Sequence, residues 1–224
     1  MIGISKLYMG QVEASDPLRY GRHSAKLPSH LLQFSADKKP VVVWNVTSAC
    51  NLACTHCYAA TKGTPDELDT SEALALIDDL ADFGCPVLLF SGGEPFMRPG
   101  ILDLAHHAVS KGLRVVFSTN GTLIDDALTE QIKEIGVSYV GISIDGSEAT
   151  HDRFRASPGA YRRSLAGIRA CREAGIKVGL RVTMTRDNIA DIPAIFDLME
   201  AEHIPRICLY HLVYCARGAD FTSP

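Results

Sequence analysis

The sequence predicts an α/β fold, a partial (β/α)6, TIM-like barrel of parallel strands with an N-terminal extension. Short apolar runs rich in β-branched residues alternate with longer segments in which apolar residues recur at helical spacing. Gly84, Gly112, Gly136 and Gly175 each follow one of these longer segments, as helix-terminating glycines do. Near-continuous apolar strands indicate a parallel sheet covered by helices, and right-handed crossovers curl such a sheet into a barrel or part of one.

The predicted elements occupy residues 40–218. Strands are predicted where apolar and β-branched residues run together, at Val41–Val46, Val87–Ser91, Leu113–Ser118, Tyr139–Ile144, Lys177–Thr183 and Arg206–Leu212. Helices are predicted between them, at Ser71–Phe83, Ile101–Lys111, Asp125–Ile135, Tyr161–Ala174 and Asp191–Glu202. Residues 1–39 are predicted to form the extension and residues 219–224 the truncated start of a C-terminal region. Sites in such barrels lie at the carboxyl ends of the strands, so the residues that follow each strand are the candidates.

Composition sets modest bounds. The chain has 224 residues, 46% hydrophobic and 21% charged, which is ordinary for a soluble globular domain with one core and an extension. We expect no membrane span, because no run of about 18 apolar residues occurs, and no secretion signal, because the start of the chain is too polar. A net charge of −4 does not indicate nucleic-acid binding. Thiols without a spaced disulfide framework indicate the reducing cytoplasm.

Cys50, Cys54 and Cys57 follow the first predicted strand, separated by three residues and then by two. Three thiolates can hold three irons of a cubic iron–sulfur cluster, whereas a cluster for electron transfer alone normally uses four. The remaining iron would then be an open coordination site for a substrate or cofactor.

Two other interpretations of the cysteines stay open. Cysteines are often small buried hydrophobes, which is our interpretation of Cys85, Cys171, Cys208 and Cys215. The clustering of the other three argues against it for them. A zinc site could use the three cysteines and His56. Against it, His56 directly precedes Cys57, and neighbouring side chains in a tight loop rarely both point at one metal.

Four motifs together resemble a known family. The three cysteines, with Tyr58 after them, resemble the signature loop of the radical S-adenosylmethionine (SAM) enzymes. Residues 91–95, Ser-Gly-Gly-Glu-Pro, resemble that family's Gly-Gly-Glu-Pro motif, and residues 118–121 and 143–146 resemble its next two strand ends. All four occur in the family's order, each at the end of a predicted strand.

The resemblance implies two cofactors, a [4Fe-4S] cluster held by the three cysteines and SAM chelated to its open iron. An electron from the cluster would cleave SAM to release the 5'-deoxyadenosyl radical. The resemblance also implies that Gly92 and Gly93 let the backbone approach the methionyl group, and that Glu94 contacts the methionyl ammonium. Further cofactor contacts are implied at Tyr58, Asn120, Ser143, Asp145 and Arg155. Of these, Ser143 and Asp145 would bind the ribose hydroxyls, and Arg155 the methionyl carboxylate, unless Arg155 is a solvated surface charge.

The first residues, including Met1–Tyr8 and Leu18–Arg22, resemble one radical SAM subgroup that acts on modified sirohaem. This implies an enzyme of haem biosynthesis that removes acetate side chains from didecarboxysirohaem to give iron-coproporphyrin. The implied partners are a tetrapyrrole substrate and an electron donor of the ferredoxin or flavodoxin type. Arg19, Arg22 and Lys26 could pair with the carboxylates of the tetrapyrrole. His23 could contact its iron or a carboxylate, unless His23 is a solvated surface histidine.

Members of this subgroup continue into a cysteine-rich C-terminal extension that holds an auxiliary cluster, and we expect that extension to be absent from this chain. Cys208 and Cys215 lie seven residues apart and form no compact cluster motif. Two alternative functions stay open: a radical SAM enzyme that modifies a peptide, and a non-catalytic zinc-binding module.

Overall fold

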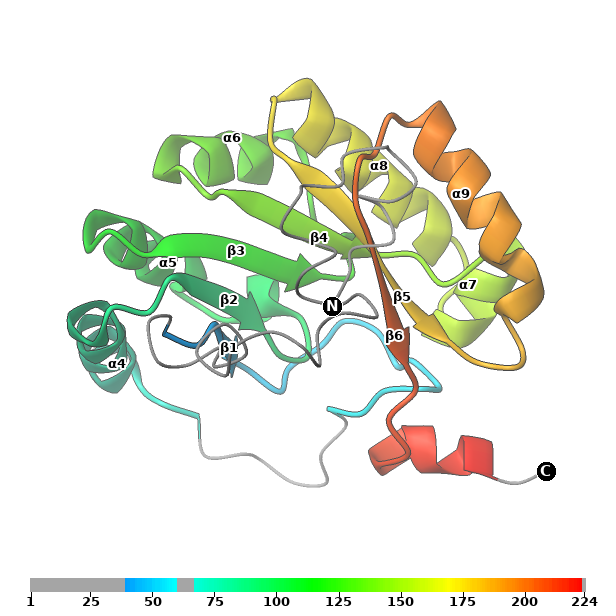
Figure 1. Ribbon diagram of the computed structural model, residues 1–224, viewed down its shortest axis with the longest axis horizontal. Helices are drawn as coiled ribbons and strands as arrows, with labels where there is room; N and C mark the ends of the chain where they lie inside the picture. Colours follow the sequence, from blue (N-terminus) through cyan, green and yellow to red (C-terminus); the bar gives the residue numbers. More distant parts are fainter. Residues whose placement is uncertain (1–38, 60–66, 223–224) are drawn as a thin grey trace, which may run out of the picture.

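The computed structural model describes residues 39–59 and 67–222. All six predicted strands are present, each within a residue or two of its predicted bounds: β1 Val42–Asn45, β2 Val87–Ser91, β3 Arg114–Thr119, β4 Tyr139–Ser143, β5 Val178–Met184 and β6 Ile207–His211. They form one sheet in the order β1-β2-β3-β4-β5-β6, and every neighbouring pair is parallel. The sheet curves into a half-barrel with its helices on the outer side (Figure 1), so the predicted partial barrel is confirmed.

The five predicted helices are also present, as α4 Thr70–Phe83, α5 Ile101–Ser110, α6 Asp126–Ile135, α8 Ala160–Glu173 and α9 Ile192–Ala201. Helix α4 begins with a reciprocal cap, in which Asp69 accepts from the Glu72 backbone N–H and Glu72 accepts from that of Asp69. It ends at Gly84, whose φ of +79° lies in the left-handed region that glycine favours.

Four short elements were not predicted: the helix α7, Glu148–Arg155, and the 3-10 turns η2 Pro95–Met97, η3 Ile189–Asp191 and η4 Ala216–Thr222. The sequence of α7 is polar, and three of its four buried residues are Thr150, His151 and Arg155. Apolar periodicity therefore cannot reveal it.

The core lies between the sheet and the helices. On β2, β3 and β4, alternate residues such as Phe90, Phe117 and Ile142 are fully buried there. Because side chains alternate across a strand, the residues between them face the concave side of the half-barrel. On β1 and directly before it, this side carries Val43 and Val41, which are 60% and 55% exposed.

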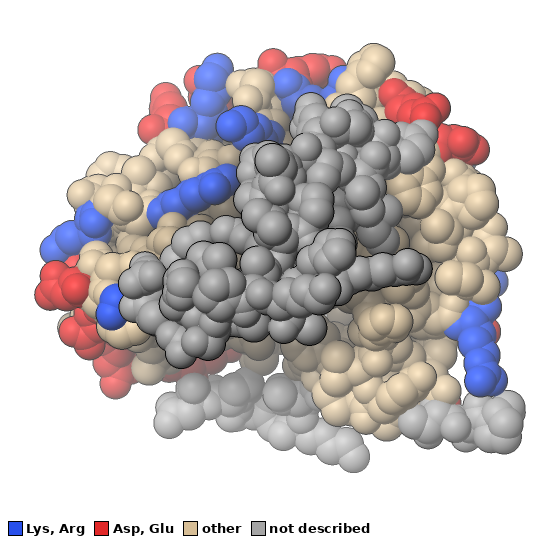
Figure 2. Space-filling view, in the orientation of Figure 1, with Lys and Arg blue, Asp and Glu red and all other residues tan. Residues whose placement is uncertain are grey.

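Several predictions concern residues outside the described ranges. The extension at 1–39, with Arg19, Arg22, His23 and Lys26, lies outside them except for Lys39. The predicted domain boundaries at residues 39 and 218 stay predictions. No helix in residues 39–59 and 67–222 is long and apolar enough to cross a membrane. On the face shown in Figure 2, lysine and arginine side chains are interspersed with acidic ones around the periphery.

Candidate cofactor site at the carboxyl edge of the sheet

The four motifs meet at one edge of the sheet. Because the strands are parallel, the cysteine loop after β1 and the segments that end β2, β3 and β4 lie side by side. Two hydrogen bonds of 2.8 Å join the first two segments, from Gly93 N to Thr47 O and from Glu94 N to Ala49 O. The sequence therefore places its chemically distinctive residues where sites in barrels occur.

The cysteine loop is held by its backbone. Thr55 N donates to Phe154 O at 2.8 Å, and Arg217 Nε donates to Cys54 O at 2.7 Å. All three thiols are free; Cys50 is exposed, Cys54 is buried and Cys57 is half-buried. Although Cys50 as a residue is exposed, surrounding protein atoms partly shield its thiol from water and raise its pKa, with smaller contributions from Cys54, Glu94 and Cys57 and against the opposing hydrogen bond from Leu52 N. The thiols are therefore available as ligands.

His56 does not join the cysteines. Its ring lies 5.2 Å from that of Phe154, and its Nε2 lies 3.7 Å from Asp145 Oδ2. Within the described part of the chain, no three Cys, His, Asp or Glu side chains are grouped so as to hold a single metal ion. Three cysteine ligands to separate irons of one cluster need no such convergence. The donor set fits an iron–sulfur cluster better than zinc.

Gly92 and Gly93 contact the loop before Cys50. A Cβ on Gly92 would collide with the Thr47 carbonyl oxygen, and one on Gly93 with those of Ser48 and Ala49. The glycines therefore let two backbone segments meet directly, a role that differs from the predicted approach to a methionyl group.

Glu94 is fully buried between β2 and β3. Its Oε1 accepts from Thr119 Oγ1 at 2.7 Å and from Phe96 N at 3.3 Å, and its Oε2 accepts from Asn120 N at 2.8 Å. Burial raises the pKa of Glu94 to about 7 despite these hydrogen bonds. A cation placed next to this carboxylate would favour its ionised form.

Asn120 connects the end of β3 to the cysteine loop. Its Nδ2 donates to Asn51 Oδ1 at 2.8 Å, and Asn51 Nδ2 donates to Thr122 Oγ1 at 2.8 Å. Asn51, between Cys50 and Cys54, was not among the predicted site residues. These amides fix the loop relative to the sheet.

Arg155 is buried and forms an ion pair with Asp145, with 2.6 Å between Nη2 and Oδ2. Its Nη1 lies 3.6 Å from Cys54 Sγ. The alternative that Arg155 is a solvated surface charge is therefore wrong. Burial alone would raise the pKa of Asp145. The guanidinium of Arg155, with smaller contributions from His56 and His151, holds this pKa below its usual value. Helix α7 thus brings a fixed cation next to a cysteine.

His151 and Asn188 complete the surroundings of Asp145, and neither was predicted. Asp145 N donates to His151 Nδ1 at 3.1 Å, and Asn188 Nδ2 donates to the Asp145 carbonyl at 2.8 Å. Burial lowers the pKa of both His56 and His151 to about 4, so both rings are neutral near pH 7.

The remaining predicted residues lie at the same edge. Ser143 ends β4, and Tyr58, 51% exposed, follows Cys57. Cys85 and Cys171 are buried as predicted, but Cys215 is exposed, with its Sγ 3.7 Å from Tyr58 O. The prediction of a buried Cys215 is therefore wrong, because the segment after β6 folds back along the cysteine loop.

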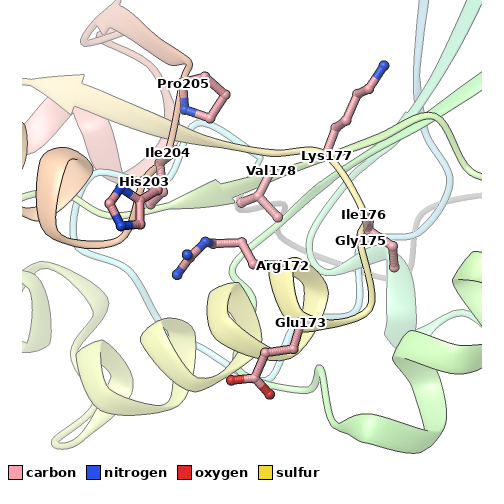
Figure 3. Close-up of a pocket in the computed structure, with 9 residues that line it drawn as sticks. All are labelled: Arg172, Glu173, Gly175, Ile176, Lys177, Val178, His203, Ile204 and Pro205. Atoms are coloured by element: carbon pink, nitrogen blue, oxygen red, sulfur yellow. The ribbon is translucent and has the colours of Figure 1, made fainter.

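A separate pocket of about 360 Å³ lies at the opposite, amino-terminal ends of β5 and β6 (Figure 3). Arg172, Lys177 and His203 are among its lining residues, and none of the motif residues contributes to it. The pocket is therefore distinct from the site at the carboxyl edge of the sheet.

Comparison with known proteins agrees with this geometry. The family model described as the radical SAM superfamily matches residues 44–199. The chain belongs to this superfamily. Its enzymes use an iron–sulfur cluster and SAM, so both kinds of cofactor predicted from the motifs are those of the family.

Two relatives sharpen the resemblance. The chain is 62% identical over 225 residues to Fe-coproporphyrin III synthase of Methanosarcina barkeri, covering 100% of this chain and 56% of the relative. It is 44% identical over 182 residues to pre-heme d1 synthase of Dinoroseobacter shibae, covering 80% and 45%. The chain thus spans about half the length of these curated relatives. The predicted resemblance to a haem-biosynthesis subgroup is confirmed.

Among solved structures, the chain is similar to Streptococcus suis SuiB bound to its precursor peptide SuiA, with a TM-score of 0.71 and 18% identity. This match covers 86% of this chain and 43% of SuiB. At this identity it supports the half-barrel fold alone.

Proposed function

We propose that this chain is the cofactor-binding half-barrel of an enzyme that removes acetate side chains from didecarboxysirohaem to give iron-coproporphyrin. The observation that carries the proposal is the 62% identity to Fe-coproporphyrin III synthase, which extends over the whole chain. The proposed substrate is a tetrapyrrole, the electron donor is of the ferredoxin or flavodoxin type, and the compartment is the cytoplasm.

Cys50, Cys54 and Cys57 are proposed to hold a [4Fe-4S] cluster. When bound, a cluster with one iron free of protein ligands supplies the electron that cleaves SAM to methionine and the 5'-deoxyadenosyl radical. The chain's own contribution is to fix the three thiols. The backbone bonds to Phe154 and Arg217 hold the loop, and Arg155 Nη1 donates to Cys54 Sγ.

The predicted SAM contacts are proposed at the same edge. Buried Glu94 would accept from the methionyl ammonium, and Arg155 would bind the methionyl carboxylate. Ser143 and Asp145 would bind the ribose, with Gly92, Gly93, Asn120 and Tyr58 as further contacts. The ion pair adds a second task for Asp145, since it also orients Arg155.

Iron uptake tests the cluster. Anaerobically reconstituted protein should bind about four irons and four sulfides per chain and be brown, whereas the triple Cys50/Cys54/Cys57→Ala variant should stay colourless. Cys85→Ala, which removes a thiol far from the loop in sequence, is the control and should reconstitute normally. Tight zinc binding without iron uptake would replace the enzyme with a zinc-binding module.

SAM cleavage tests the second cofactor. Reduced protein should form 5'-deoxyadenosine, and Glu94→Gln, which keeps the size but removes the charge, should weaken SAM binding about tenfold or more. Glu130→Ala, at an exposed position on α6, should leave binding unchanged. An unaltered affinity in Glu94→Gln would remove Glu94 from the site.

Incubation with didecarboxysirohaem, and separately with a cysteine-containing peptide, tests the substrate. Loss of acetate mass from the tetrapyrrole supports the proposal. Modification of the peptide alone would replace it with a peptide-modifying function. Because the chain spans about half the length of these relatives, the assay should also include a polypeptide of the relatives' full length.

A further inference from the structure

The concave side of β4, β5 and β6 carries polar side chains, most of which the proposed cofactor contacts do not use; Ser143 is the exception. Val140, Ile142, Leu180 and Val182 pack into the core beneath the helices. The residues that alternate with them therefore face the concave side. They are Tyr139, Gly141 and Ser143 on β4, Gly179, Arg181 and Thr183 on β5, and Cys208 and Tyr210 on β6.

Arg181 extends sideways across this surface. Its Nη1 donates to Tyr210 Oη at 2.6 Å, and its Cζ lies 5.8 Å from the centre of the Tyr210 ring. The part of the side chain before Nη1 lies over Gly141, where an added Cβ would collide with Arg181 Nε. The absence of a side chain at residue 141 thus gives the guanidinium room to lie flat on the sheet.

In the described part of the chain, no carboxylate balances the positive charge of Arg181. Among residues 39–59 and 67–222, it forms no ion pair with an Asp or Glu. The two acidic residues at the nearby edge are already engaged, Glu94 by Thr119 and Asn120, and Asp145 by Arg155. Tyr210 is a neutral partner, and the buried Nε of Arg181 has no hydrogen-bond acceptor in the described part of the chain.

A second unpaired group lies on the same surface. Tyr139 is 6% exposed and crosses Gly179, yet its hydroxyl finds no hydrogen-bond partner among the described residues. Buried polar groups in folded proteins are usually paired, so unpaired donors together with an unbalanced cation indicate a ligand with acceptor oxygens.

The position of Arg181 relates this surface to the cofactor edge. Arg181 is the register partner of Ser143, the predicted ribose contact, and Thr183 is the register partner of Tyr210. Across the sheet, β1 and the residue before it contribute the exposed Val43 and Val41 to the concave side. The concave side therefore combines an apolar wall with a guanidinium one strand away from Ser143.

We propose that Arg181 and Tyr210 form a carboxylate-binding subsite on the concave side of the half-barrel, which holds a carboxylate side chain of the substrate. Arg181 supplies the charge and Tyr210 holds the guanidinium in place. This inference rests on the proposed function, because a substrate with an apolar ring system and peripheral carboxylates matches both parts of the surface.

The test compares didecarboxysirohaem with its carboxylate methyl esters, using cluster-loaded protein and absorbance titration. Arg181→Gln should weaken binding of the free acid about 10- to 100-fold, while SAM affinity stays within about twofold of the unmodified protein. Gly141→Ala, which displaces the guanidinium without removing its charge, should lower affinity in the same direction. Arg162→Gln removes an equal charge from a side chain that is 78% exposed on α8, and should have no effect.

The ester comparison separates recognition from a structural role. The unmodified protein should prefer the acid to the ester, and Arg181→Gln should lose this preference. An equal loss of affinity for both forms would make Arg181 and Tyr210 a structural pair, and a loss confined to SAM would assign them to the cofactor; either result overturns the inference. If the unmodified protein binds neither form, the proposed function itself fails and the inference fails with it.

Discussion

The burial of His151, next to Asp145, makes the stability of this protein depend on pH. Because burial lowers the pKa of His151 to about 4, the folded chain keeps this ring neutral while the unfolded chain protonates it near pH 6.5. The stability is fully present above pH 6.5 and is lost as the pH falls from there toward 4. At pH 4.5 the loss from this one group is about 2–3 kcal/mol.

The structure suggests a variant that isolates this contribution. His151 Nδ1 accepts a hydrogen bond from Asp145 N, so its proton must lie on Nε2, and protonation of the ring would break that bond. His151→Asn keeps an acceptor oxygen in a similar place but cannot be protonated in this range. We expect the variant to lose about 2–3 kcal/mol less than the unmodified protein between pH 7 and pH 4.5.

Urea unfolding of both proteins at the two pH values measures this difference. The matched control is His106→Asn, because His106 is exposed on α5 and should leave the pH dependence unchanged. If His151→Asn and the unmodified protein lose equal stability on acidification, the ring is hydrated in the folded state and the reasoning from burial is wrong.

Three further variants and one control test the packing in and around the site. Gly93→Ala should cost more than about 2 kcal/mol of unfolding free energy and impair iron uptake, because its Cβ would collide with two carbonyl oxygens. As the control, Gly112→Ala should lower the unfolding free energy by only about 1 kcal/mol, because a Cβ at this position (φ +83°) would meet no atom within 4 Å. Equal losses of unfolding free energy for the two glycine variants in urea titrations would refute the steric explanation. Asp145→Asn should cost about 3–5 kcal/mol by leaving the buried Arg155 cation unpaired; a loss below about 1 kcal/mol on thermal unfolding would mean that water reaches the guanidinium. Asp152→Ala removes the acceptor of the Tyr161 backbone N–H and should lower the unfolding free energy by about 1–2 kcal/mol. Hydrogen exchange at the Tyr161 amide should become faster. An unchanged exchange rate would mean that this hydrogen bond does not protect the amide.

Apolar strands and glycine-terminated helices made most of the fold predictable. A strand such as Val87–Ser91 is apolar up to its last residue because one face packs under helices and the other lines the half-barrel. Its bounds follow from the local pattern alone. The parallel order of the strands then puts the four motifs at one edge, so the location of the site was also predictable.

What sequence could not reveal was which polar residues are buried. Arg155 was consistent with both a cofactor contact and a surface charge, because α7 has too few apolar residues to be recognised as a helix that faces inward. Asp145 could be placed at a strand end, but its ion pair with Arg155 and its bonds to His151 and Asn188 depend on side chains from two other segments, α7 and the turn before η3. Likewise, no local pattern shows that the segment carrying Cys215 and Arg217 returns to the cysteine loop.

The contact between Arg217 and Cys54 has a consequence for the order of events during protein synthesis. Each strand of the sheet pairs with the one made just before it, so the half-barrel can grow from β1 to β6 as the chain leaves the ribosome. The cysteine loop belongs to the first part of the chain, yet Arg217, which donates to the Cys54 carbonyl and so clamps the loop, follows 163 residues later. At typical rates of translation that interval is roughly 10–30 seconds. We therefore expect nascent chains to expose their three thiols until the segment after β6 emerges, so that metal acquired earlier would meet an unclamped loop.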